Sequence, residues 1–337
     1  MVKSICIILF YSGFIYAGKA QVAKDTIRMG VFIESLYDID FANYSFNTNF
    51  WMWSVAHGDI NNDGKINEED SIASLERIKL IALSNAKEYA YSSQMAFKVE
   101  SGGKTFWWAT QFCRAEIYQK WELESYPFDP QEMSLKFENT AFDTTQAIML
   151  NGQDSVSFKD DINLVGWDIY KSKIHSSIVK YNTDFGDPNG NGSSYYSRVV
   201  FTVQMERISA FSYFIKLCLG AFVAFLVALL VFAIGPPAIE SRFGLGVGAL
   251  FAVAANKYVV DLSIPENATN CLIDKIHEIT FVYILITLVA SVISLYLERG
   301  EKIQERKKFD LIAAVLVLTT YTLIIWQFGL LANGYKL

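Results

Sequence analysis

The stretch of residues 240–265 constrains the fold most, because it is apolar enough for a membrane but is unlike a helix that faces lipid. It contains Gly244, Gly246 and Gly248, several alanines and the polar pair Asn256-Lys257. Small residues let helices approach closely, and ionisable residues at membrane depth usually face protein or water. The composition therefore predicts a helix packed inside a membrane assembly.

A narrow stripe runs along this helix if each residue advances by about 100°. The stripe holds an acid, small residues, two aromatic residues and a leucine: Glu240, Gly244, Gly248, Phe251, Ala255, Tyr258 and Leu262. Such a stripe suits a helix that lines a pore. The alternative is a packed central helix whose glycines serve contact alone. Lys257 falls on roughly the opposite side, four residues before Asp261, a spacing that allows an ion pair.

Three further apolar segments accompany this one, so four membrane helices are predicted within residues 209–337, at about 211–234, 242–262, 276–297 and 309–331. The mean hydropathy of +0.23 is too high for a soluble enzyme and too low for a protein made only of membrane helices. The chain is therefore expected to be part aqueous and part embedded.

The N-terminal part carries two different signals. Residues 1–20 contain a lysine, then an apolar run, then small residues of the kind that precede a cleavage site, as in a secretory signal peptide. The alternative is an uncleaved first membrane helix. Residues 21–208 contain short segments of β-branched and aromatic residues separated by turn residues, which predict an immunoglobulin-like antiparallel β-sandwich. The segments expected as strands are 27–33, 45–55, 78–83, 94–100, 105–116, 132–138, 168–179 and 197–207.

Charge in the connections predicts the topology. The linker 298–308 carries five basic residues, whereas the loop 261–275 has Lys275 against three acids. Basic residues mark the cytoplasmic side, so the β-domain and the C-terminus are expected outside.

The net charge of −6 without a basic block argues against a nucleic-acid partner. With three histidines, four cysteines and no nucleophile–base spacing or phosphate loop, an enzyme is not predicted.

Several motifs now point to one family. Residues 126–131, Tyr-Pro-Phe-Asp-Pro-Gln, are similar to the signature loop of the pentameric ligand-gated ion channels, the Cys-loop receptor superfamily. Residues 166–169, 49–51 and 85–88 resemble a strand motif of the bacterial branch and two segments of the agonist site. Arg207 stands where the family keeps a basic residue before its first helix, and residues 240–265 align with the pore helix. The resemblance runs from about Ile27 to the C-terminus.

The sequence also departs from the family. No cysteines flank the signature loop, which matches the bacterial branch. The Trp-x-Pro motif that precedes the segment at Asn85 is missing, and Gly244 and Gly248 occupy stripe positions that are usually hydroxylated. These departures bear on the ligand and on conductance rather than on the fold.

The resemblance implies a homopentamer with an agonist site between subunits and a pore lined by Glu240, Gly244, Gly248, Phe251, Ala255 and Tyr258. A ring of Glu240 carboxylates would select cations, and Phe251 and Tyr258 would constrict the pore. Pairing of Glu240 with Arg242 is the alternative. Expected ligand-wall residues, which could instead be core aromatics, are Trp51, Phe142, Tyr181, Phe185, Tyr195 and Tyr196; an aromatic cage suits cationic amines.

Coupling between the β-domain and the pore is expected at Asp40, Asp129, Arg207 and Pro265. The alternative is that the three charged residues among them are ordinary surface charges, which contribute little to stability. The protein is expected in a bacterial inner membrane, in contact with lipid, with its β-domain in the periplasm and with an unidentified small molecule or ion, protons included, as agonist. A non-conducting envelope receptor that keeps the fold is the competing prediction.

One motif lies outside the family pattern. Residues 59–70 match the twelve-residue calcium loop, with a glycine at position six and a final aspartate as in dockerin modules. The ligand positions are Asp59, Asn61, Asp63, Lys65 (through its carbonyl), Asn67 and Asp70. The alternative is an acidic hairpin turn, since Asn-Asp-Gly is a strong turn signal. Because turns seldom fill every ligand position, Ca²⁺ is the expected cofactor, and it would stiffen the β-domain or modulate gating.

Overall fold

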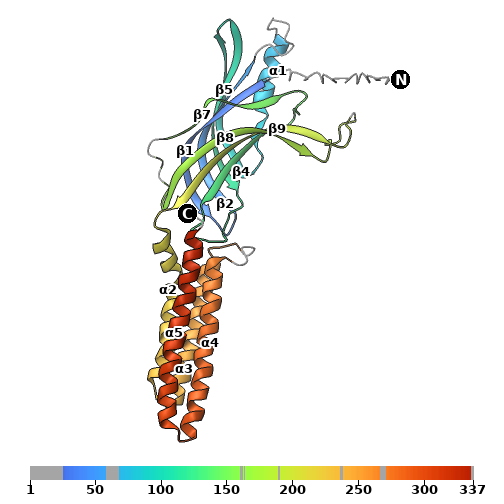
Figure 1. Ribbon diagram of the computed structural model, residues 1–337. Coiled ribbons are helices and arrows are strands. Elements are labelled where there is room, and N and C mark those ends of the chain that lie inside the picture. Colours follow the sequence, from blue (N-terminus) through green and yellow to red (C-terminus); the bar gives the residue numbers. More distant parts are fainter. Residues whose placement is uncertain are drawn as a thin grey trace, which may run out of the picture.

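The computed structural model describes residues 26–57, 68–159, 162, 164–188, 190–235, 238–265 and 271–334. Within them, a β-domain is followed by four long helices, which form a bundle that extends from one end of it (Figure 1). The last helix returns toward the β-domain, so its C-terminal end lies beside the base of that domain (Figure 1). The predicted order of a sheet domain and then a helical bundle is confirmed. Residues 1–20, with the features of a signal peptide, lie outside the described residues.

Nine strands form two sheets within the described part of the β-domain. The five-stranded sheet has the order β4-β5-β2-β1-β7, with β1 Thr26–Asp40, β2 Ser45–His57, β4 Ala86–Ser101, β5 Lys104–Tyr118 and β7 Ile148–Phe158. The four-stranded sheet has the order β3-β6-β9-β8, with β3 Ile81–Leu83, β6 Gln131–Asn139, β8 Trp167–Tyr181 and β9 Ser194–Arg207.

The pairing differs from a wholly antiparallel sandwich at one place, because β7 runs parallel to β1, with Ile27 opposite Met149. The chain reaches β7 directly after β6, which belongs to the other sheet. The segment of β7 is absent from the predicted strands, since Asn151-Gly152 has the composition of a turn. Of the predicted strand 78–83, residues 78 and 79 end a helix, α1 Glu68–Lys79, whereas residues 81–83 form strand β3 as predicted.

The core of the β-domain follows the two-residue alternation of a strand. On β2, Phe46, Phe50 and Met52 are buried, whereas Trp51 between them is 40% exposed. The Phe50 ring meets Phe137 of the other sheet, with ring centroids 5.9 Å apart. Burial of such aromatic side chains supplies much of the energy that holds two sheets together.

The bundle consists of four helices long and apolar enough to cross a membrane: α2 Ala210–Leu229, continued by the 3-10 turn η1 Leu230–Ala233, α3 Ile239–Asp261, α4 Leu272–Arg299 and α5 Ile303–Gly334. The four predicted spans are confirmed, which indicates a multi-pass membrane protein. α5 begins earlier than predicted, inside the basic linker, because Arg306 and Asp310 pair across one helical turn, with Nη1 and Oδ2 3.2 Å apart.

The β-domain rests on the bundle through the connection between β5 and β6, residues 119–130, which contains most of the signature-like segment 126–131. The backbone N–H of Leu272, at the start of α4, donates to the carbonyl of Glu124 in this loop over 3.0 Å. The Phe128 ring lies 5.6 Å from that of Phe214 on α2. The loop therefore contacts two of the four helices directly.

Candidate functional site

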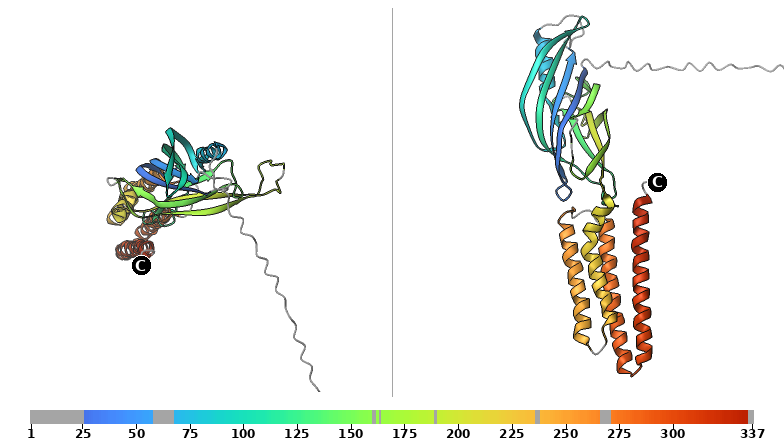
Figure 2. Two further views of the ribbon diagram at one scale, coloured as in Figure 1. Left: turned by 90° about the horizontal axis from the view of Figure 1, so that it is seen from above. Right: turned by 90° about the vertical axis from the view of Figure 1, so that its left-hand side faces the viewer.

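The predicted stripe of α3 lies on a face that none of the described helices covers. Phe251 and Tyr258 are 72% and 67% exposed, and Glu240, Gly244, Gly248 and Ala255 are exposed too. The opposite face of α3 is buried and consists of Arg242, Gly246, Ala249, Val253 and Val260. In the right view of Figure 2, α3 stands at one side of the bundle and α5 at the other.

The glycines of α3 have two different environments. A Cβ atom added to Gly246 would overlap the side chain of Leu288 on α4, whereas around Gly244 and Gly248 there is nothing within 4 Å. Gly246 therefore serves helix contact. Gly244 and Gly248 instead leave a smooth, open face, which is not what a central packed helix requires.

The two basic side chains of α3, Arg242 and Lys257, also lie away from the stripe. Arg242 is buried on the opposite face and reaches Asp310 of α5, with Nη2 and Oδ1 3.5 Å apart, rather than Glu240. Lys257 pairs with Asp261 and with Asp274, the latter over 2.9 Å. Among the described residues of α3, Glu240 is thus the carboxylate on the stripe.

Three of the expected ligand-wall residues meet in an aromatic cluster at the outer end of β8 and β9, defined here as Tyr181, Phe185 and Tyr196. Their ring centroids lie 5.6, 5.7 and 5.9 Å apart, and all three pairs meet edge to face. The cluster is not a filled core, since Phe185 is 63% exposed and Tyr181 and Tyr196 are half-buried.

Two residues outside the predicted ligand wall hold the Tyr181 ring in place. The Tyr181 hydroxyl donates to Glu138 over 2.8 Å and accepts from Nη2 of Arg198 over 3.2 Å. Arg198 also pairs with Glu138. Burial and the adjacent Glu138 raise the pKa of Tyr181, which keeps the hydroxyl a donor. Because 60 residues separate Glu138 from Arg198 in the sequence, no local pattern reveals this pair.

The other expected wall residues lie elsewhere in the chain. Tyr195 points to the opposite face of β9, where Lys180 Nζ lies 6.0 Å from its ring centroid. Phe142 packs under Arg77 of α1, at 5.2 Å. Trp51 belongs to the other sheet and lies 5.1 Å from Phe112, its cross-strand partner. Trp51 therefore lies on a different sheet from the strands next to the aromatic cluster.

The expected coupling residues each have partners of their own. The Arg207 guanidinium lies among aromatic rings, 3.9 Å from the centroid of Tyr213 and 4.4 Å from that of Trp167. The Asp40 carboxylate accepts two hydrogen bonds from Asn43, at 2.9 and 2.8 Å. Arg207 and Asp40 nevertheless line one cavity of about 380 Å³ at the junction between the β-domain and the bundle. Pro265 is buried near this junction.

Asp129 faces a different environment from Asp40. Burial raises the pKa of its carboxyl to about 6, the nearby Glu124 and Glu122 add to the rise, and a 2.6 Å bond from the Ser125 N–H opposes it. The fold therefore favours the protonated carboxyl. Its stabilising effect is complete below the ordinary value of 3.8 and is lost as the pH rises through about 6.

We expect the full-length protein in detergent to lose stability between about pH 4 and pH 6, by about 1 kcal/mol in the free energy of unfolding after allowance for solvent screening. Asp129→Asn, which stays neutral, should remove this part of the pH dependence, and Glu122→Gln at an exposed position should keep most of it. Thermal unfolding across this pH range provides the measurement. Equal slopes for wild type and Asp129→Asn would contradict the assignment.

The predicted calcium loop lies mostly outside the described residues, which include none of Asp59, Asn61, Asp63, Lys65 or Asn67. Asp70, its last position, is described; it lies in the first turn of α1 and is buried. Among the described residues, no group of three or more His, Cys, Asp or Glu side chains is placed to hold a metal ion.

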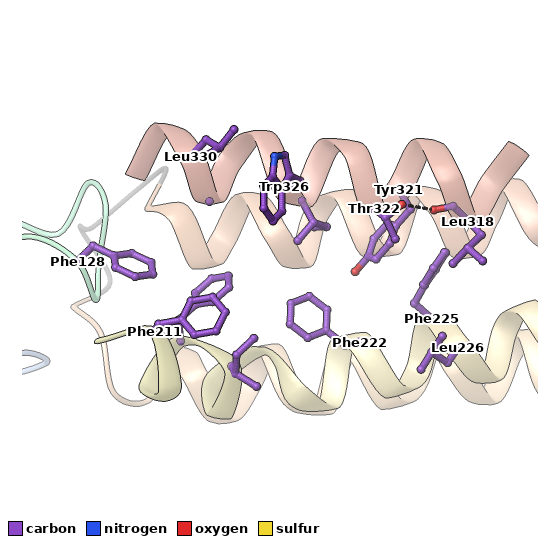
Figure 3. Close-up of a pocket in the computed structure, with 14 residues that line it drawn as sticks. Phe128, Phe211, Phe222, Phe225, Leu226, Leu318, Tyr321, Thr322, Trp326 and Leu330 are labelled. Atoms are coloured by element: carbon purple, nitrogen blue, oxygen red, sulfur yellow. Dashed lines mark hydrogen bonds between the residues drawn. The ribbon is translucent and has the colours of Figure 1, made fainter. Parts of the chain in front are cut away.

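A second cavity of about 430 Å³ lies between α2 and α5. Figure 3 shows Phe211, Phe222 and Phe225 of α2 opposite Tyr321 and Trp326 of α5, with Phe128 at the end nearest the β-domain. The two lining hydroxyls already have partners: Tyr321 bonds to Thr280, and Thr322 donates to the Leu318 carbonyl, each over 2.9 Å (Figure 3 draws the second). The cavity is therefore lined mainly by apolar side chains, and its two hydroxyls have partners within the chain.

The comparison with protein-family models gives no match. The chain is similar to the neuronal acetylcholine receptor subunit alpha-9 of Rattus norvegicus, with 26% identity over 163 residues, which is 48% of this chain and 32% of the relative. The subunit of Gallus gallus is 23% identical over 291 residues, 82% of this chain and 57% of the relative. The Homo sapiens subunit is 26% identical over 163 residues, with 48% and 32% covered.

The chain thus spans between 32% and 57% of the length of these relatives. The distant similarity supports a relationship with the superfamily of Cys-loop ligand-gated channels. The two-sheet domain followed by four apolar helices is consistent with the fold of that superfamily.

Proposed function

We propose that the chain is one subunit of a homopentameric ligand-gated ion channel in which five copies of α3 enclose a cation-conducting pore. The observation that carries the proposal is the uncovered stripe of α3. Its large apolar side chains, exposed in a single chain, would otherwise face lipid together with an ionisable Glu240. An acid on a membrane helix is costly unless it faces water or protein. A ring of five copies places this stripe around water.

The same ring would complete a ligand site between neighbouring subunits. The aromatic cluster lies on the four-stranded sheet of one copy, and Trp51 with Phe112 lies on the five-stranded sheet of the next. Aromatic faces from both sides would enclose an organic cation through cation–π attraction. The relatives are named as acetylcholine receptor subunits, which fits a small cationic amine as the class of agonist.

The proposal extends to orientation and setting. Arg299, Lys302 and the basic run 306–308 lie at the end of the bundle remote from the β-domain, so that end would face the cytoplasm. The absence of cysteines around the signature-like loop favours the bacterial branch of the superfamily and the inner membrane of a bacterium. Calcium bound at residues 59–70 would then act on the outer domain and modulate the current.

Planar-bilayer recording of the purified full-length protein tests the function, with choline and primary alkylamines as probes and with calcium added or chelated. We expect ligand-dependent current with a reversal potential near that of potassium in a potassium chloride gradient. Glu240→Gln should move the reversal potential toward zero by tens of millivolts, because it removes the carboxylate ring at the pore mouth. Asp59→Ala should abolish any effect of calcium.

Glu305→Gln is the matched control, since it removes an exposed acid from the same end of the bundle but on α5. It should leave the reversal potential unchanged. A fivefold particle without current under any probe would favour the non-conducting receptor instead. Monomeric particles would overturn the proposal altogether.

A further inference from the structure

Arg242 is the basic residue nearest to Glu240 in the sequence, yet its side chain lies on the buried face of α3, opposite the stripe. Its side chain is only 2% exposed and contacts all three other helical segments at this end of the bundle. Nε donates to the Val231 carbonyl over 2.9 Å, Nη1 donates to Ser294 over 3.0 Å, and Nη2 lies 3.5 Å from Asp310. One guanidinium thus joins α3 to η1, α4 and α5.

The charge of Arg242 is balanced by a chain of ion pairs on helices remote from the stripe. Asp310 is itself 5% exposed and also accepts a hydrogen bond from Nη1 of Arg306 over 3.2 Å. Arg306 Nε lies 2.8 Å from the carboxylate of Glu298 at the end of α4. Two bases and two acids therefore cancel. Asp310 is the carboxylate that contacts Arg242 directly, and removal of one partner from a buried pair leaves the other charge uncompensated.

Helix geometry makes this balance matter for the pore. Arg242 follows Glu240 by two positions, so at about 100° per residue their side chains leave α3 on nearly opposite sides. Both lie in the first turn of α3. A long arginine side chain released from its partners would extend toward the water at this end of the bundle. There it would offset the charge of the Glu240 ring.

We propose that Asp310 is a specificity-determining residue: by anchoring Arg242 away from the pore, it leaves the Glu240 carboxylates as the uncompensated charge at the pore mouth. This inference rests on the proposed channel function and assigns a role in ion selection to a residue of α5 that does not contact the pore. At the other end of α3, Lys257 is likewise held away from the stripe by ion pairs, with Asp261 and Asp274.

The test compares the cation-to-anion permeability ratio of three variants in bilayers. Asp310→Asn keeps the shape of the side chain but releases Arg242, and the ratio should fall about tenfold because five mobile cations then surround the mouth. Asp310→Asn combined with Arg242→Gln removes the released charge and should restore the wild-type ratio. Ser294→Ala, which removes a neutral partner and keeps the ion pair, should leave the ratio unchanged.

A second measurement does not depend on current. Modification of Arg242 by phenylglyoxal, followed by mass spectrometry, should be slow in the wild type and about tenfold faster in Asp310→Asn. Pentamers that carry a minority of variant subunits supply both measurements if the homomeric variant does not assemble. Unchanged selectivity in a conducting Asp310→Asn channel would overturn this inference alone. A double variant as unselective as the single variant would overturn it too, whereas a silent wild type would refute the proposed channel itself.

Discussion

Phe251→Ala is expected to make the protein conduct without ligand. Phe251 is 72% exposed on the stripe of α3 and is flanked there by Gly248 and Ala255. In the proposed ring, five phenyl groups narrow a pore that small residues leave wide below them, and a narrow apolar ring blocks ions by excluding water. Alanine removes that ring. We expect the ligand-independent current to rise about 100-fold, which corresponds to about 2.7 kcal/mol.

The control for Phe251→Ala is Tyr296→Ala. Tyr296 is 78% exposed on α4, so the variant deletes an equally exposed aromatic side chain from a helix that does not carry the stripe. Its ligand-independent current should match that of the wild type. Single-channel recording without any amine gives the comparison. Equal basal currents in Phe251→Ala and the wild type would remove Phe251 from the gate and would place the constriction elsewhere, for example at Tyr258.

Gly246→Ala is expected to destabilise the bundle by about 1–3 kcal/mol. A methyl group at this position would overlap Leu288, and both Cγ and one Cδ atom of that side chain stand in the way. Leu288 would have to leave its rotamer, or α3 and α4 would have to separate. The thermal unfolding midpoint of the purified protein should therefore fall, and part of the protein should elute outside the oligomer peak.

For Gly248→Ala on the same helix, we expect no loss of stability. Nothing lies within 4 Å of the position that its Cβ would occupy, and alanine costs less backbone entropy in a helix than glycine, by about 0.5–1 kcal/mol. The unfolding midpoint should rise slightly or stay unchanged. If both variants shifted the midpoint in the same direction, the assignment of one glycine to packing and the other to the open face would be wrong.

Local patterns are enough to predict the division of the chain and the face of α3. The helical repeat fixes which side chains share a side of a helix, so the stripe from Glu240 to Tyr258 follows from the order of the residues alone. The strand repeat likewise separates Trp51 from the buried Phe50 and Met52. Both repeats are properties of the backbone, and they hold wherever the element packs.

Contacts between distant segments are decided by the tertiary structure. The sequence suggests Glu240 as the partner of Arg242, but helix packing places Asp310, 68 residues away, beside it. It suggests acids around Arg207, but aromatic rings surround that guanidinium. It groups Tyr195 with Tyr196, and the strand turns them to opposite faces. The physical reason is that sequence spacing sets direction within one element, whereas partners depend on how the elements pack against one another.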